Sequence, residues 1–216
     1  IMAGSALNNR GVINLLDEIV TYMPTANEHR NVYATDVAAD ELVHVDCEEN
    51  GLLAAQVFKT VYDPYSGKLN YIKIYRGKLK TGDVVYNADT GKEERIGQIF
   101  TLMGKKCELV TELTAGDIGA VNKLTATDTN NTLCALGTNL RFDPVRFPRP
   151  ALSMAVKAVN KGEEDKVFSG LNKMREEDYT FSVTKNAETG ELILSGQGET
   201  HLELLTAKLK SRLGIC

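Results

Sequence analysis

Apolar positions near the start of the chain recur at helical spacing. The stripe consists of Val12, Leu15, Leu16, Ile19, Val20 and Met23. It predicts an amphipathic helix that ends before Pro24, because proline cannot continue the hydrogen-bond pattern of a helix. A single helix cannot bury such a stripe by itself. Residues 25–51 are polar, acidic and weakly periodic, which indicates a linker leading into a strand near residues 42–45.

A different pattern occupies residues 52–140. Short runs rich in β-branched and aromatic residues alternate with Gly, Asp and Asn turns. The runs cover residues 55–61, 69–75, 84–86, 96–102 and 118–121. Strands at this spacing, with no helical pattern between them, predict a barrel or a sandwich.

Three prolines within residues 141–150 indicate an extended linker. After it the period alternates between that of a strand and that of a helix. The strand-like runs are 152–158, 179–183 and 192–194, and the helical stripes are 167–174 and 202–213, the last closed by Gly214. The order βαββα predicts a ferredoxin-like unit without its last strand. We expect Leu152 and Met154 to face its core.

The composition places the chain among ordinary globular proteins. Of 216 residues, 43% are hydrophobic and 25% charged, so collagen-like and disordered classes are excluded. The net charge of −4 gives no overall attraction to nucleic acid or anionic lipid, so any polyanion site must be local. No apolar run is long enough to cross a membrane, and no signal peptide is recognisable, so we expect a cytoplasmic location without membrane contact.

Neither metal nor redox chemistry is indicated by the cysteines and histidines. They are widely spaced, at Cys47, Cys107, Cys134 and Cys216 and at His29, His44 and His201. The acidic runs 163–165 and 176–178 are better explained by the helix dipole than by catalysis. Because no nucleophile or apposed base accompanies His201, we interpret this residue as a packing or partner contact. We expect no metal ligands and no catalytic residues.

Positive charge is concentrated between residues 59 and 80. Six basic residues stand there against Asp63, a local charge of +5. Strand alternation turns Tyr71 and Lys73 outward and Ile72 into the barrel. The outward face is either an ordinary solvated surface or a phosphate-binding surface.

Five motifs give the sequence a resemblance to a known family. Residues 77–83 (G-x-L-x-x-G-D) and 115–118 (A-G-D-I) resemble the second domain of translational GTPases, and residues 63–69 (D-P-Y-x-G-K-L) are similar to the elongation factor G group. Residues 195–203 resemble the G-x-G-E-L-H-L-E signature of that family's third domain, and residues 160–166 resemble the first helix of that domain. Asn130, Tyr179 and Thr200 depart from the family pattern.

The resemblance implies a mixed β and α+β fold. We expect a translation-factor β-barrel followed by a ferredoxin-like βαββα domain III, after a short helical remnant of a GTPase domain. The expected boundaries are 1–28 for the remnant, 29–51 for the linker that leads into the barrel, 52–143 for the barrel (domain II), 144–150 for the Pro-rich linker, and 151–216 for domain III, truncated before its last strand.

The resemblance also implies site residues. The guanine-loop remnant is Ser5, Ala6 and Leu7; the residues for ribosomal RNA contact are Lys68, Lys73, Arg76, Lys78 and Lys80; and the domain III signature is Gly196, Gly198, Glu199 and His201.

The implied function is that of a piece of a ribosome-binding translation factor. GTP and Mg²⁺ would serve the parent protein, whose hydrolysis of GTP, in the part of the GTPase domain absent here, would be coupled to movement of tRNA and mRNA. This sequence has no P-loop and no N-K-x-D motif, so we expect it to carry no cofactor and to be inactive alone. Expected partners are ribosomal RNA and ribosomal proteins, not DNA, and we expect a monomer apart from edge-strand association. A ribosome-protection type of GTPase and a stand-alone barrel binding module remain alternatives.

Overall fold

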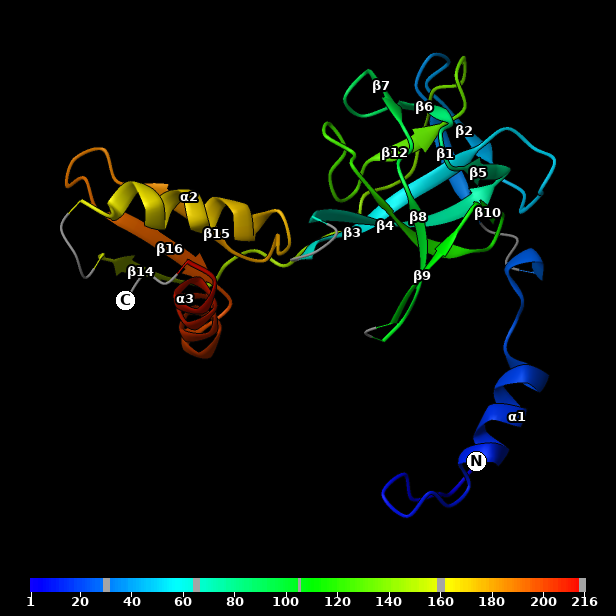
Figure 1. Cartoon of the computed structure of the whole chain (residues 1–216), viewed down its shortest axis with the longest axis horizontal. Helices are drawn as coiled ribbons and strands as arrows, with labels where there is room; N and C mark the ends of the chain where they lie inside the picture. The colour runs from blue at the N-terminus through cyan, green and yellow to red at the C-terminus, as the bar shows by residue number, and fades with distance from the viewer. Residues whose placement is uncertain (29–31, 64–66, 105, 159–161, 214–216) are drawn as a thin grey trace.

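The computed structural model describes residues 1–28, 32–63, 67–104, 106–158 and 162–213. Figure 1 shows two bodies joined by an extended segment, with a barrel on one side and a small sheet with two helices on the other. The turn at 64–66, residues 160–161 of the helix motif, His29, the Gly214 cap and Cys216 lie outside the described residues.

Helices are few in the described part of the chain. They are α1 (Val12–Tyr22), the short 3-10 helix η1 (Ala26–Glu28), α2 (Glu164–Arg175) and α3 (Glu199–Leu213). The helix expected before Pro24 is α1, and within the described residues none of its side chains is buried. No helix in the described ranges is long and apolar enough to cross a membrane.

The other regular elements are β-strands. The strands are β1 (Tyr33–Asp36), β2 (Glu41–His44), β3 (Ala54–Asp63), β4 (Gly67–Arg76), β5 (Lys78–Lys80), β6 (Val84–Asn87), β7 (Lys92–Arg95), β8 (Ile99–Met103), β9 (Lys106–Val110), β10 (Glu112–Thr114), β11 (Ile118–Asn122), β12 (Thr132–Cys134), β13 (Leu140–Arg141), β14 (Leu152–Val156), β15 (Ser182–Lys185) and β16 (Leu192–Gly196).

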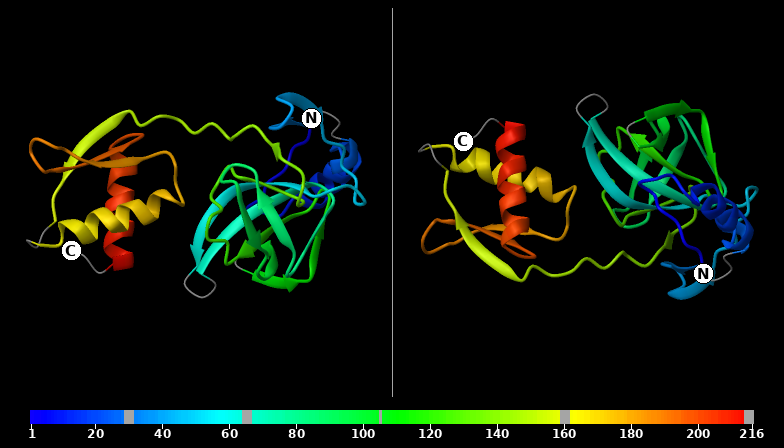
Figure 2. Two further views of the ribbon diagram at one scale, coloured as in Figure 1. Left: turned by 90° about the horizontal axis from the view of Figure 1, so that it is seen from above. Right: turned by 90° about the horizontal axis from the view of Figure 1, so that it is seen from below.

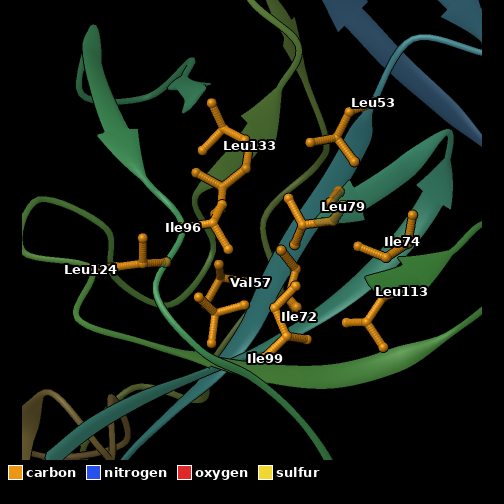
Figure 3. Close-up of a cluster of buried hydrophobic side chains, with 13 residues drawn as sticks. Leu53, Val57, Ile72, Ile74, Leu79, Ile96, Ile99, Leu113, Leu124 and Leu133 are labelled. Carbon is orange, nitrogen blue, oxygen red and sulfur yellow. The ribbon is translucent and has the colours of Figure 1, made fainter. Parts of the chain in front are cut away.

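The barrel is built on one antiparallel sheet. Its strand order is β7-β6-β12-β3-β4-β11-β8-β9, and the pair β10-β5 lies beside it. The long β3–β4 hairpin runs through the middle, with Ile72 and Ile74 fully buried on its inner face. Figure 3 shows both side chains among the leucines and isoleucines that fill the interior. The predicted inward orientation of these isoleucines is confirmed.

A third sheet lies where the sequence indicated mainly a linker. The strands β13-β1-β2 pair antiparallel, and β2 corresponds to the strand predicted near residues 42–45. Strand β1 was not predicted, because its four residues, Tyr-Ala-Thr-Asp, are too few to show a clear alternation, although it pairs with both β2 and β13. Ala34 and Val45 join Phe142 in a small separate core. Residues 32–51 therefore contain more regular structure than a linker.

The second body has the predicted order βαββα. Its sheet order is β14-β16-β15, all antiparallel, as in a ferredoxin-like split βαβ unit. Its two helices are seen from both sides in Figure 2. Leu171, Phe181 and Leu194 are almost completely buried between the sheet and the helices.

The first strand of this body faces the core side as predicted, since Met154 pairs with the buried Leu194, but it is less buried than expected. Leu152 is 36% exposed and Met154 is 48% exposed, so neither belongs to the core. The reason is that α3 packs on β16 and α2 on β15, which leaves β14 beside the covered part of the sheet. Period-two alternation identified the strand but did not show which strands the helices cover.

Side-chain amides fix the linker between the two bodies at both ends. At the barrel end, the Val145 N–H donates to Asn130 Oδ1 at 2.8 Å, and Asn130 Nδ2 donates to the Val145 carbonyl at 3.1 Å. At the other end, Gln197 Nε2 donates to the carbonyls of Arg149 at 3.1 Å and Thr180 at 2.9 Å. The linker is therefore extended and held, as its proline content favours.

Candidate functional site

The outer face of β4 carries lysines above aromatic rings. Lys73 Nζ lies 4.9 Å from the centre of the Tyr75 ring, and Lys59 Nζ on the neighbouring strand lies 5.8 Å from that of Tyr71. Burial raises the pKa of both tyrosines, so their hydroxyls stay neutral. The aliphatic stems cover the rings while the ammonium groups reach water. This arrangement presents positive charge on a rigid, partly apolar surface.

The turn after β4 requires a glycine at position 77. Gly77 has φ 79°, and its N–H donates to the Glu48 carbonyl at 2.7 Å. A Cβ at this position would lie 2.7 Å from the Gly51 carbonyl oxygen and 2.8 Å from the Leu53 nitrogen. Only glycine fits this approach of two backbones. The first glycine of the G-x-L-x-x-G-D motif therefore fixes the direction of the chain that carries the next lysines.

Some of the local positive charge is neutralised by carboxylates distant in sequence. Lys78 Nζ lies 2.9 Å from Glu49 Oε2, and Lys80 Nζ lies 3.7 Å from Glu112 Oε2. The Glu49 carboxylate raises the pKa of Lys78. Within the described ranges, no carboxylate forms an ion pair with Lys59 or Lys73.

Arg76 stands between these two groups of lysines. Its Nε donates to the Leu52 carbonyl at 2.9 Å, which fixes the side chain against the turn. Its stem lies over Gly51, where a Cβ would come within 2.6 Å of Arg76 Cγ. The guanidinium is therefore held at the margin of the surface defined by Lys59, Tyr71, Lys73 and Tyr75, which we call the basic face.

Lys68 is not part of the basic face. Its Nζ lies 2.6 Å from Asp128 Oδ1 and 3.8 Å from Glu176 Oε2, and its side chain is only 17% exposed. Sequence reasoning grouped Lys68 with the other basic residues because both carboxylates are far away in the chain. The structure places it between the barrel and the second body.

The loop expected as a guanine contact is closed on itself. Ser5 and Arg10 exchange two backbone hydrogen bonds of 3.0 Å, and Leu7 is 95% exposed. The Ser5 hydroxyl accepts a long hydrogen bond of 3.4 Å from the Asn8 N–H. Ser5, Ala6 and Leu7 thus form a short turn before α1, without a lysine or a carboxylate to hold phosphate or Mg²⁺. A guanine contact by these residues stays a prediction.

The residues of the G-x-G-E-L-H-L-E resemblance build a structural corner. The Gln197 N–H donates to His201 Nδ1 at 3.2 Å, so the proton of the ring is on Nε2, which lies 3.3 Å from Asp178 Oδ2. A Cβ on Gly196 would lie 2.7 Å from the Leu202 side chain, which explains that glycine. Gly198 and Glu199 lead into α3 and have no such constraint in the structure.

The environment of His201 gives the ring no free nitrogen. Burial alone would raise the pKa of Asp178, but hydrogen bonds from Thr180 and His201 hold it below its ordinary value. The His201 ring also packs edge-on against Phe181, with centroids 6.3 Å apart. This geometry suits packing and not general base catalysis.

Sequence reasoning missed Glu94, a buried carboxylate of the barrel. It is 8% exposed, and its Oε1 accepts hydrogen bonds from the backbone N–H groups of Thr125 at 2.6 Å and Ala126 at 2.8 Å. The Thr127 hydroxyl donates to its other oxygen. Burial would raise the pKa of Glu94, but these hydrogen bonds lower it. Within Lys-Glu-Glu-Arg, nothing in the sequence distinguishes this residue from an exposed strand residue.

Comparison with known proteins gives consistent matches along most of the chain. A family model described as Elongation factor G domain 2 matches residues 52–136, and one described as Elongation Factor G, domain III, matches residues 147–216. Elongation factor G of Chlamydia caviae is 36% identical over 209 residues, which cover 97% of this chain and 30% of that protein.

A solved structure agrees with these sequence matches. A crystal structure from Thermus thermophilus superposes with a TM-score of 0.71 at 28% identity and covers 93% of this chain and 28% of that one. The chain therefore spans less than a third of the length of these relatives.

Proposed function

Because the chain belongs to the elongation factor G family, we propose that the basic face of its barrel contacts ribosomal RNA. The observation that carries the proposal is the placement of Lys59 and Lys73 over tyrosine rings, without carboxylate partners in the described part of the chain. Phosphate contacts by lysine supply affinity for nucleic acid, and the partly buried tyrosine rings hold the lysine stems in place. Because the net charge of this chain is −4, contact with RNA requires such a local surface.

The rest of the proposed activity belongs to a complete family member. We propose that the parent protein binds GTP and Mg²⁺, acts in the cytoplasm and couples hydrolysis to movement of tRNA and mRNA on the ribosome. The residues described here supply none of the phosphate or Mg²⁺ ligands. Their part is to present the basic face and to connect it, through the linker, to the ferredoxin-like domain.

Neutralising the basic face is expected to weaken ribosome binding in a salt-dependent way. Lys59→Gln and Lys73→Gln together remove two ammonium groups without touching the barrel core. The slope of log affinity against log salt should fall by about one for each lost phosphate contact. Cosedimentation with ribosomes at rising salt concentrations measures this slope.

Lys106→Gln is the matched control, because Lys106 is an exposed lysine of β9 that is ion-paired with Glu108. An unchanged slope in the double variant would remove the basic face from the interface. If the unmutated 216-residue chain showed no salt-sensitive binding to ribosomes, the stand-alone binding module would be favoured instead.

The 216-residue chain is expected not to bind GTP with micromolar affinity, because no lysine, P-loop or Mg²⁺ ligand accompanies the Ser5 turn. Isothermal calorimetry with GTP and Mg²⁺ tests this expectation. Saturable binding that is lost on Ser5→Pro would show that the turn is a working guanine site.

A further inference from the structure

Charged side chains from both bodies meet where the outer end of the β3–β4 hairpin extends toward the loop that follows α2 (Figure 1). Tyr62 and Lys68 are opposite each other in the register of the hairpin. Glu176 and Glu177 directly follow α2. We call the set formed by Tyr62, Lys68, Asp128, Glu176, Glu177 and Arg212 the junction cluster.

The hairpin donates directly to both glutamates of the second body. The Tyr62 hydroxyl donates to Glu176, and the Tyr62 backbone N–H donates to Glu177 Oε1 at 3.0 Å. Burial, together with the hydrogen bond to Glu176, raises the pKa of the Tyr62 phenol well above its ordinary value, so it remains a donor. Lys68 adds a positive charge 3.8 Å from Glu176 Oε2.

Glu177 also connects the hairpin to the C-terminal helix. Arg212, in the last turn of α3, donates from Nη1 to the same Oε1 that accepts from Tyr62, at 2.9 Å. The Glu177 side chain is only 18% exposed. One carboxylate oxygen therefore links β3, the segment after α2 and the end of α3.

An aromatic contact lies on the second body beside the cluster. Phe147 of the linker stacks on Tyr179, with centroids 5.3 Å apart and planes at 19°. Burial raises the pKa of Tyr179, with Asp128 of the barrel adding to the effect. The linker and the cluster thus constrain the same boundary from two directions.

We propose that the junction cluster is a reversible latch that holds the barrel and the ferredoxin-like domain in one orientation. Two domains joined by a small polar interface are expected to move independently. Charge-assisted hydrogen bonds are directional, so a shared acceptor such as Glu177 fixes an angle as well as a distance. Glu176 is 38% exposed and Arg212 45% exposed, so water can replace their partners when the latch opens.

The latch is independent of ribosome binding, so it can be tested on the isolated chain. Residual dipolar couplings and ¹⁵N relaxation are measured for the 216-residue protein and for the Tyr62→Phe/Glu177→Ala double variant. In the unmutated 216-residue chain, both domains should share one alignment tensor. In the variant, each domain should take its own tensor, and its rotational correlation time should fall by about half.

The control is Lys80→Ala/Glu112→Ala, which removes an ion pair within the barrel and should keep one tensor. The dispersion of each domain's amide signals shows whether it remains folded. If the double variant loses a folded domain, Tyr62→Phe alone, which removes only a hydroxyl, is measured for the same separation of tensors. The proposal would be overturned if the two domains had separate alignment tensors in the unmutated chain. It would also be overturned if they kept one tensor in a folded Tyr62→Phe/Glu177→Ala or Tyr62→Phe variant.

Discussion

Replacing Gly77 with alanine is expected to lower the free energy of unfolding of the barrel by about 3 kcal/mol. The new Cβ would lie 2.7 Å from the Gly51 carbonyl oxygen and 2.8 Å from the Leu53 nitrogen. Both are backbone atoms, so neither can move as a side chain would. The positive φ of 79° adds strain that alanine tolerates poorly. Urea unfolding measures the loss of stability, and hydrogen exchange at the buried amides of Ile72 and Ile74 gives an independent value for the barrel.

The Gly137→Ala variant separates the two causes of destabilisation, which are the close contact of the new Cβ and the positive φ. Gly137 also has a positive φ, 83°, but a Cβ there would meet nothing within 4 Å. Its replacement should cost about 1 kcal/mol, from backbone strain alone. Equal losses at the two positions would mean that the close approach of the backbones at Gly77 contributes nothing.

Replacing Glu94 with alanine is expected to destabilise the barrel by a similar amount, about 3 kcal/mol. The change leaves the N–H groups of Thr125 and Ala126 and the Thr127 hydroxyl without their acceptor. Buried donors that lose a charged acceptor bear the full cost of desolvation. Denaturant unfolding, monitored through barrel amides, tests the expected loss.

The same carboxylate predicts a pH dependence with a definite sign. The folded-state pKa of Glu94 is lowered, so folding favours its ionised form. Its contribution to stability is therefore present above the unfolded-state pKa, about 4.3, and is lost as the pH falls through the folded-state value. In the Glu94→Gln variant, the stability of the barrel should fall less steeply as the pH is lowered. The acid-induced loss of stability of the second domain should not change, because there Asp178 has its own lowered pKa. An acid limb of the same steepness in the Gln variant would assign the effect to other carboxylates.

Local periodicity was sufficient to locate the elements whose apolar residues gather on one face. The stripes of α1 and α2 and the alternation of β3 and β4 are visible in the sequence because each alone separates apolar from polar positions. Strands β1 and β13 could not be recognised, since they have only four and two residues, and β13 pairs with a strand about a hundred positions away. Leu152 and Met154 show the same limit, because strand alternation does not tell which strands the helices cover.

Charge arithmetic located the basic face but not its limits. It counted Lys68 with Lys73, although Asp128, sixty positions away, holds Lys68 in the junction cluster. Two of the departures from the family pattern, Asn130 and Tyr179, lie on the linker contacts and on its aromatic stack. The sequence identified them as unusual, but only the fold shows that they sit at one boundary.

Under tension, the segment between the domains should behave as a stiff rod and not as slack chain. Asn130 holds it at one end and Gln197 at the other, through paired amide hydrogen bonds. Only a few residues lie between these two anchored ends, so the segment can lengthen little when it is pulled. A pull on the ferredoxin-like domain would therefore reach the barrel with little extension of the segment, whereas the angle between the two domains is left to the junction cluster.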